Sequence, residues 1–208
     1  MVATNNNIKA FIYDLGGVIM TYNDESLSSK VSKLEELFGD KLDDLEQGRF
    51  TLEEYLETLD DEHYFKKMAS KMGITNDFTK ISPQLMVKDD NIEKSIKVLK
   101  ENGYKIALLT NNFYLDKEKK NPTTIEDLSS FDVVVESCKV GMSKPNENIY
   151  QHTLSLLGIE GSEAVFLDDL EANCRGAEKV GIKAIQVLPQ KSIDAVREIE
   201  KLTGLNIL

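Results

Sequence analysis

The sequence lacks any apolar stretch that approaches the roughly 18 residues of a membrane-spanning helix. The N-terminal segment, Met1 to Asn7, has neither a basic start nor an apolar core, so it does not read as a signal peptide. We therefore expect a cytoplasmic protein that has no membrane partner.

Cysteine is also scarce, and basic residues are outnumbered by acidic ones. Cys138 and Cys174 are the two cysteines, and they form neither a disulfide framework nor a metal-spaced cluster, so we expect free thiols. Lysine and arginine number 25 against 36 aspartates and glutamates, which gives a net charge of −11. Such an acidic surface repels nucleic-acid backbones and anionic membranes, and it argues against both as partners. A phosphate ligand would need a local basic group or a metal ion.

Short apolar runs separated by helical patterns are the main feature of the chain, and its 208 residues suit one domain or a core with a modest insertion. These runs are continuous rather than alternating, which indicates strands that are buried on both faces of a parallel sheet. The predicted strands are Lys9–Tyr13, Lys105–Leu109, Asp132–Val135, Ala164–Leu167 and Lys183–Val187.

Apolar residues at helical spacing lie between the predicted strands. Three such patterns end at Gly103, Gly158 and Gly181, and glycine is a common stop signal just past a helix. Strands that alternate with helices of this length predict a doubly wound, Rossmann-like α/β fold.

Residues 21–88 interrupt this alternation, because they contain no strand-like run. They carry helical patterns instead, and Thr51-Leu52-Glu53-Glu54 has the form of a capping box. We predict an α/β core formed by residues 1–20 and 89–208, with an all-helical cap inserted at residues 21–88.

Polar side chains directly follow several predicted strands. Asp14 follows the first strand, Thr110-Asn111 the second and Asp168-Asp169 the fourth, while the loop after the third leads to Lys144. Ligands of open α/β sheets bind outside the carboxyl ends of the strands. We therefore expect these residues to converge on one edge of the sheet.

This order of an aspartate, a threonine, a lysine and an acidic pair resembles the four motifs of the haloacid dehalogenase (HAD) superfamily, in its helical-cap subgroup. The segment Glu136–Pro145, together with Val165–Asp169, is especially similar to the phosphatase domain of soluble epoxide hydrolases and to the HAD domain of acyl-CoA dehydrogenase-like proteins. The resemblance implies a Mg²⁺-dependent phosphatase that acts on a small phosphorylated metabolite.

The resemblance also implies roles for individual residues. Asp14 would attack phosphorus and form an aspartyl phosphate. Thr110 and the backbone amides near Asn111 would bind the transferred phosphoryl group. Lys144 would neutralise Asp14 and the phosphate.

The metal ligands follow from the same resemblance. Asp14, Asp168 and Asp169 would supply carboxylate oxygens, which are the ligands that Mg²⁺ prefers. The backbone carbonyl of Gly16 would supply a further oxygen, and this ligand needs no side chain.

Gly16 is the departure from the family pattern, which has a second aspartate at this position. In the family that aspartate serves as general acid and base, a contribution of typically about 10²–10⁴-fold. Asp24 is one candidate to replace it. The alternatives are an impaired relative that only binds metal or phosphate, and a 2-haloacid dehalogenase, in which the same aspartate attacks carbon.

Overall fold

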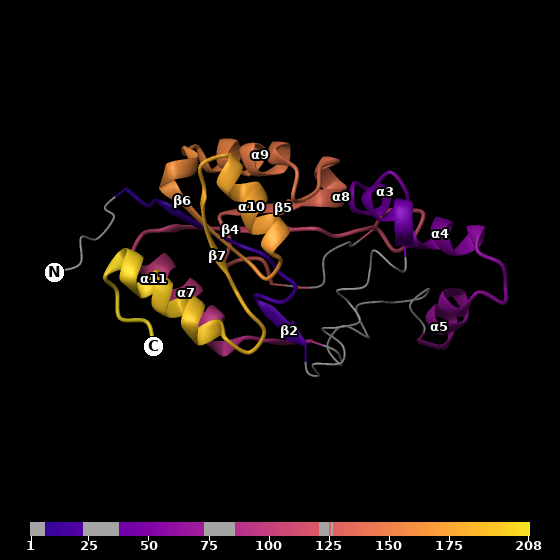
Figure 1. The fold of residues 1–208 in the computed structure, drawn as a ribbon, viewed down its shortest axis with the longest axis horizontal. Coiled ribbons are helices and arrows are strands. Elements are labelled where there is room, and N and C mark those ends of the chain that lie inside the picture. The colour runs from indigo at the N-terminus through magenta and orange to yellow at the C-terminus, as the bar shows by residue number, and fades with distance from the viewer. Residues whose placement is uncertain (1–6, 23–37, 73–85, 121–124, 126) are drawn as a thin grey trace.

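A computed structural model describes residues 7–22, 38–72, 86–120, 125 and 127–208. Its centre is a parallel sheet of five strands in the order β5-β4-β1-β6-β7 (Figure 1). Each strand agrees with a predicted one to within one residue at either end. The strands are β1 Ala10–Tyr13, β4 Lys105–Thr110, β5 Val133–Glu136, β6 Ala164–Asp168 and β7 Lys183–Gln186.

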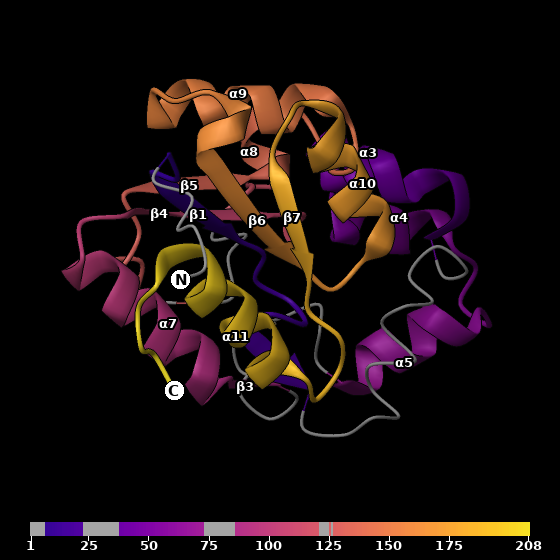
Figure 2. The ribbon, with the colours of Figure 1, turned by 60° about the vertical axis from the view of Figure 1, so that its left-hand side comes forward.

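Helices cover both faces of this sheet (Figure 2). Helices α7 (Asp90–Glu101) and α11 (Ser192–Thr203) pack together on one face. Helices α9 (Glu147–Leu157) and α10 (Glu171–Lys179) pack together on the other. The doubly wound α/β prediction is confirmed.

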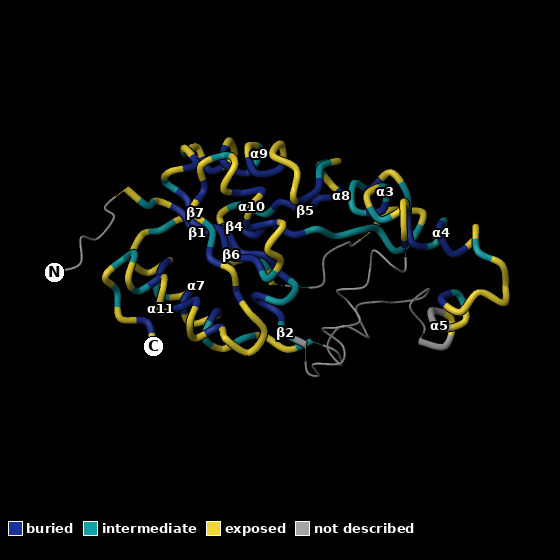
Figure 3. The backbone as a smooth tube through the Cα atoms, in the orientation of Figure 1, coloured by how far each residue is buried: buried dark blue, intermediate teal, exposed yellow. Residues whose placement is uncertain are grey.

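Alternating side chains of the central strand divide the core into two layers. Phe11 and Tyr13 of β1 pack into the cluster that contains the apolar residues of α7 and α11. Ala10 and Ile12 pack into the cluster that contains those of α9 and Ala177 of α10. Strand β1 is therefore buried on both sides, and this burial explains its continuous apolar run. Figure 3 colours the strand as buried.

Two strands of the structure were not predicted. Strands β2 (Met20–Tyr22) and β3 (Met86–Lys88) pair in antiparallel fashion, so the expectation that residues 21–88 contain no strand is wrong. Each is only three residues long. Val87 of β3 is exposed, so β3 produces no apolar run, and β2 begins at the end of the run Val18–Met20, just before the insertion. Their pairing brings the two ends of the insertion together.

The other described elements of the insertion are helical. They are the 3₁₀ turn η1 (Gly39–Lys41) and the helices α3 (Leu42–Glu46), α4 (Leu52–Thr58) and α5 (Tyr64–Met72). The capping box at Thr51 is confirmed, because its hydroxyl accepts the Glu54 amide and its own amide donates to the Glu54 carboxylate. A further helical pattern, expected from Leu27 to Phe38, lies outside the described residues except for Phe38.

These helices share a small apolar core with a loop of the α/β domain. Phe38, Leu45 and Tyr55 belong to this cluster, and Phe113 and Leu115 pack against it from the loop that follows β4. The amides of Leu52 and Glu53 extend the contact by donating to backbone carbonyls of that loop. The insertion is thus attached to the segment that directly follows Thr110 and Asn111.

No described helix is long and apolar enough to cross a membrane. Both cysteines are free and buried, which agrees with the expectation of free thiols.

Candidate active site

The carboxyl ends of three neighbouring strands carry the candidate residues. Asp14 directly follows β1, and its amide donates to the Leu167 carbonyl of β6 over 2.9 Å. Thr110 is the last residue of β4 and Asp168 the last of β6. Because β1 is parallel to both neighbours and in register with them, the three side chains emerge at one edge of the sheet.

Lys144 lies between two of these carboxylates. Its ammonium nitrogen is 2.8 Å from Asp14 Oδ1 and 2.6 Å from Asp168 Oδ2, and it also donates to the Leu109 carbonyl over 3.1 Å. All three charged side chains are buried. One ammonium group therefore offsets two carboxylates in a region that water hardly reaches.

Burial and charge perturb the acid–base properties of this group. Burial raises the pKa of Asp14 to about 7, an effect that the nearby Lys144 ammonium opposes. Burial alone would lower the pKa of Lys144, but Asp14 and Asp168 more than reverse this, so its pKa is raised and it stays a cation. Burial and the charge of Asp168 raise the pKa of Asp169 to about 6.

The three aspartates form a cluster of hard oxygen donors. Asp14, Asp168 and Asp169 each offer a carboxylate oxygen, and these atoms lie within 4.8 Å of one another. With one lysine against three carboxylates the cluster carries excess negative charge, which adds to the effect of burial in raising the pKa values of Asp14 and Asp169. Oxygen donors with excess negative charge fit a divalent cation such as Mg²⁺.

Asn173 and Leu170 hold Asp168, and the turn at Gly17 lies against Asp169. The Asn173 side-chain amide donates to both oxygens of Asp168, over 3.0 and 3.1 Å, and the Leu170 amide donates to Oδ1 over 2.9 Å. Gly17 has a positive φ of 79°, and a Cβ at this position would lie 2.4 Å from Asp169 Oδ2. The turn after β1 can therefore approach Asp169 only because residue 17 is glycine.

Thr110 and Asn111 lie on the other side of the lysine. Thr110 is buried, and its hydroxyl donates to the Asn111 carbonyl over 3.3 Å. The Asn111 side chain accepts from the Lys144 amide over 2.9 Å and donates to the Lys144 carbonyl over 3.0 Å. Asn111 thus fixes the backbone of Lys144, a role for its side chain that the motif did not predict.

Gly16 lies in the turn that directly follows Asp14. It forms an isolated β-bridge with Met20, and the turn is closed by hydrogen bonds between Gly17 and Met20 and between Met20 and Leu15, each 2.8 Å long. The position next but one to Asp14 therefore presents backbone and no side chain. Asp24, the candidate replacement, lies outside the described residues.

Glu46 is a site residue that the sequence did not reveal. It is the last residue of α3, and its Oε2 accepts a hydrogen bond of 2.8 Å from the Asn111 side-chain amide. Burial raises the pKa of Glu46 to about 7, an effect that Lys144 opposes and that Asp43 and Asp14 reinforce. The one feature of the sequence that points to this contact is Gly48, two residues after Glu46. In the structure Gly48 has a φ of 65° and lies close to the Cys138 carbonyl, so this loop packs against the core.

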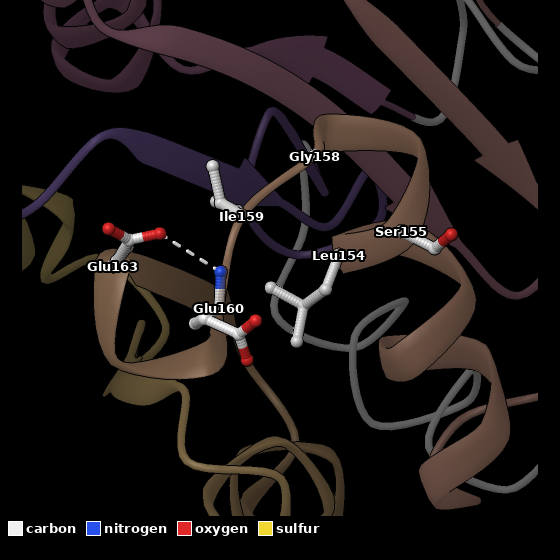
Figure 4. A pocket seen from close by; sticks show the side chains of 6 residues that line it. All are labelled: Leu154, Ser155, Gly158, Ile159, Glu160 and Glu163. Atoms are coloured by element: carbon white, nitrogen blue, oxygen red, sulfur yellow. Dashed lines mark hydrogen bonds between the residues drawn. The ribbon is translucent and has the colours of Figure 1, made fainter.

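A surface hollow of about 340 Å³ lies elsewhere, lined by Leu154, Ser155, Gly158, Ile159, Glu160 and Glu163 (Figure 4). Glu163 precedes β6, whereas Asp168 ends it, so the hollow lies at the opposite edge of the sheet. The Glu163 carboxylate in its lining has partners within the chain, since it pairs with Lys9 and accepts from the Glu160 amide. The hollow has no part in the aspartate cluster.

Comparison with known proteins assigns the chain to a family. A model of the haloacid dehalogenase-like hydrolases matches residues 8–181. The chain therefore belongs to this family and is a hydrolase. The resemblance noted in its four motifs is confirmed.

Curated relatives include mouse acyl-CoA dehydrogenase family member 10, which is 34% identical over 76% of this chain, and mouse bifunctional epoxide hydrolase 2, which is 30% identical over 77%. The chain spans only 14% and 30% of the lengths of these two relatives. A sesquiterpene phosphatase of Aspergillus oryzae is 25% identical, over 94% of this chain and 97% of that protein.

Solved structures share the fold. A predicted HAD-like family hydrolase of Porphyromonas gingivalis is 26% identical, with a TM-score of 0.63 over 93% of this chain and 98% of that one. A HAD family enzyme of Bacteroides thetaiotaomicron, solved in complex with magnesium and inorganic phosphate, is 24% identical. Its TM-score is 0.59 over 86% of this chain and 93% of that one.

Proposed function

We propose that this chain is a Mg²⁺-dependent phosphatase that hydrolyses a small phosphorylated metabolite through an aspartyl phosphate on Asp14. The observation that carries this proposal is the buried Asp14 carboxylate, held 2.8 Å from the Lys144 ammonium beside two further aspartates. A nucleophilic oxygen, a fixed cation and an acidic metal cluster are the parts that phosphoryl transfer needs.

In the proposed mechanism, Asp14 attacks phosphorus and displaces the alcohol of the substrate. Lys144 is anchored by Asp168 and by the Leu109 carbonyl, so its charge stays beside the reacting oxygens without reorganisation. The Thr110 hydroxyl and the backbone near Asn111 bind the transferred phosphoryl oxygens. Water then cleaves the aspartyl phosphate and restores Asp14.

Asp14, Asp168 and Asp169 would hold the magnesium ion, with the Gly16 carbonyl as a further ligand. When bound, Mg²⁺ supplies positive charge that lowers the repulsion between the phosphate and the carboxylates. The Bacteroides enzyme with magnesium and phosphate supports this choice of metal through its shared fold. The sesquiterpene phosphatase supports a phosphorylated substrate, because it matches this chain over nearly its full length.

We further propose that residues 1–20 and 89–208 form the catalytic core and that residues 21–88 form a cap. The contact of the described cap helices with the loop after β4 supports this division. A cap at the carboxyl edge of the sheet would exclude water and select the substrate.

The acidic pair distinguishes phosphoryl transfer from attack on carbon. A 2-haloacid dehalogenase needs no metal, whereas here Asp169 adds a carboxylate to a cluster that Lys144 does not neutralise. Halide release from a 2-haloacid in EDTA would favour the dehalogenase over our proposal. Magnesium binding without turnover of any phosphate ester would favour the impaired relative.

Phosphate release from a panel of phosphate esters tests the proposal. The panel contains p-nitrophenyl phosphate, sugar phosphates, nucleotides and lipid phosphates, each assayed with Mg²⁺ and with EDTA. We expect Mg²⁺-dependent release that falls by at least about 10³-fold in Asp14→Asn. Asp90→Asn, which removes an exposed carboxylate of α7, is the matched control and keeps wild-type activity. Release that is insensitive to Asp14→Asn would overturn the proposal.

A further inference from the structure

Phosphoryl transfer at this site needs a proton donor for the leaving oxygen and a proton acceptor for the attacking water. Gly16 provides neither, and the described aspartates have other tasks. Asp14 is the proposed nucleophile, and both oxygens of Asp168 accept hydrogen bonds from Lys144, Leu170 or Asn173. Asp169 lies against the turn at Gly17.

We propose that Glu46 is the general acid and base of this enzyme, an inference that rests on the phosphatase function proposed above. Glu46 reaches the site from the insertion. Its Oε2 is 2.8 Å from Asn111 Nδ2, and the same nitrogen is 3.0 Å from the carbonyl of Lys144. A single side chain therefore separates the Glu46 carboxylate from the residue that contacts Asp14.

Helix α3 is held firmly enough to aim this carboxylate. Leu45 is fully buried in the apolar core of the insertion. Ser143, the residue before Lys144, donates through its hydroxyl to Asp43 at the start of α3 over 3.0 Å. At the other end of the helix, Gly48 fits against the Cys138 carbonyl, and its own carbonyl accepts from Lys119 over 2.9 Å. Both ends of α3 are thus anchored to the core.

The surroundings of Glu46 suit proton transfer near neutral pH. The charged groups that act on it are Lys144 and Asp14 at the strand ends and Asp43 on its own helix. Burial outweighs the attraction to Lys144, and with the two aspartates it holds the pKa of Glu46 at about 7. Asp43 does not compete for the role, since it is exposed and is engaged by Ser143, Gln47 and Arg49.

The two steps balance as follows. In the first, an Asp14 oxygen bonds to phosphorus, the bond from phosphorus to the ester oxygen breaks, and that oxygen takes the proton of Glu46 to leave as an alcohol. In the second, the Glu46 carboxylate takes a proton from water as the water oxygen bonds to phosphorus. The bond from Asp14 to phosphorus breaks, and inorganic phosphate leaves with both side chains restored.

Glu46→Gln tests this role, because glutamine keeps the size of the side chain and an acceptor for Asn111 but loses the proton. Asp44→Asn is the matched control, since it removes one carboxylate from the same helix and Asp44 pairs outward with Arg49. Both variants are assayed with phenyl phosphate and with p-nitrophenyl phosphate. The nitrophenolate leaving group needs little protonation, whereas phenolate needs more.

We expect Glu46→Gln to lower kcat/KM about 10²–10³-fold for phenyl phosphate and much less for p-nitrophenyl phosphate. With p-nitrophenyl phosphate it should give a burst of one nitrophenolate per chain, because the aspartyl phosphate accumulates without a base. The wild type should lose kcat/KM as the pH rises through about 7, where Glu46 deprotonates, and this limb should disappear in Glu46→Gln. Glu46→Asp should restore part of the limb.

Melting temperatures of the variants separate a chemical effect from a folding defect. The inference about Glu46 is overturned if Glu46→Gln melts like the wild type and has the same leaving-group dependence and pH profile as Asp44→Asn. That result would leave the phosphatase proposal standing. Wild-type activity that survives in Asp14→Asn would overturn the phosphatase proposal, and the role of Glu46 with it. If Glu46→Gln does not fold, the pH profile of Glu46→Asp decides. A Glu46→Asp protein with the same kcat/KM and the same fall above about pH 7 as the wild type would overturn the inference.

Discussion

Lys144 compensates the negative charge of the site, because its ammonium group lies between two buried carboxylates. Removing one partner of a buried ion pair usually costs more than the pair contributed, since the remaining charge is left without compensation. The residue therefore links the stability of the fold to the chemistry proposed for this edge of the sheet.

Lys144→Met should lower the free energy of unfolding in EDTA by about 3–5 kcal/mol. The loss should be larger at pH 8 than at pH 5. Without the lysine the pKa of Asp14 rises further above its unfolded value, so the folded state binds more protons and loses stability as the pH increases. Urea unfolding at the two pH values measures this, with Lys97→Met on the exposed face of α7 as control. An equal loss for both variants would contradict the assignment.

Gly17 offers a second test at the scale of one residue. Gly17→Ala should weaken Mg²⁺ binding at least about tenfold, because the new methyl group displaces the Asp169 carboxylate. Gly103→Ala is a close control, since Gly103 also has a positive φ, of 85°, but no atom within 4 Å of the added Cβ. Both variants should lose about 1 kcal/mol of stability from backbone strain. Calorimetric titration with MgCl₂ separates them, and equal affinities would show that Asp169 is not a ligand.

Whole strands were the easiest elements to predict. The five strands of the parallel sheet are buried on both faces, so their apolar runs locate the strands and also bring Asp14, Thr110, Lys144 and Asp168 to one edge. Strands β2 and β3 were missed because each is only three residues long, and Val87 and Lys88 of β3 are exposed. Glu46 was missed because its position depends on how α3 packs against the core, and no spacing along the chain encodes that contact.

Helix α4 allows a prediction about an element of the insertion. Thr51→Ala should lower the free energy of unfolding by about 1 kcal/mol, because the Glu54 amide loses its acceptor at the helix N-terminus. Thr51→Ser keeps the hydroxyl and should stay close to the wild type. Thermal unfolding measures the difference. If the two variants lose the same stability, packing of the threonine methyl group rather than the capping hydroxyl is responsible.

At the scale of the whole molecule, charge and site complement each other. The chain carries a net charge of −11, so a phosphorylated substrate meets unfavourable charge over most of the surface. The edge of the sheet overcomes this locally through Lys144 and through the cation that the three aspartates are suited to hold. The proposed dependence on Mg²⁺ therefore follows from the local excess of carboxylates at this edge.

Trapping the covalent intermediate tests the central claim most directly. Wild-type protein turning over p-nitrophenyl phosphate with Mg²⁺ is quenched in acid, digested and examined by mass spectrometry. We predict one phosphoryl group on the peptide that contains Asp14, none in EDTA and none in Asp14→Asn. A phosphoryl group on another residue would contradict the account. So would turnover by the wild type if the peptide that contains Asp14 is labelled neither in the wild type nor in Glu46→Gln.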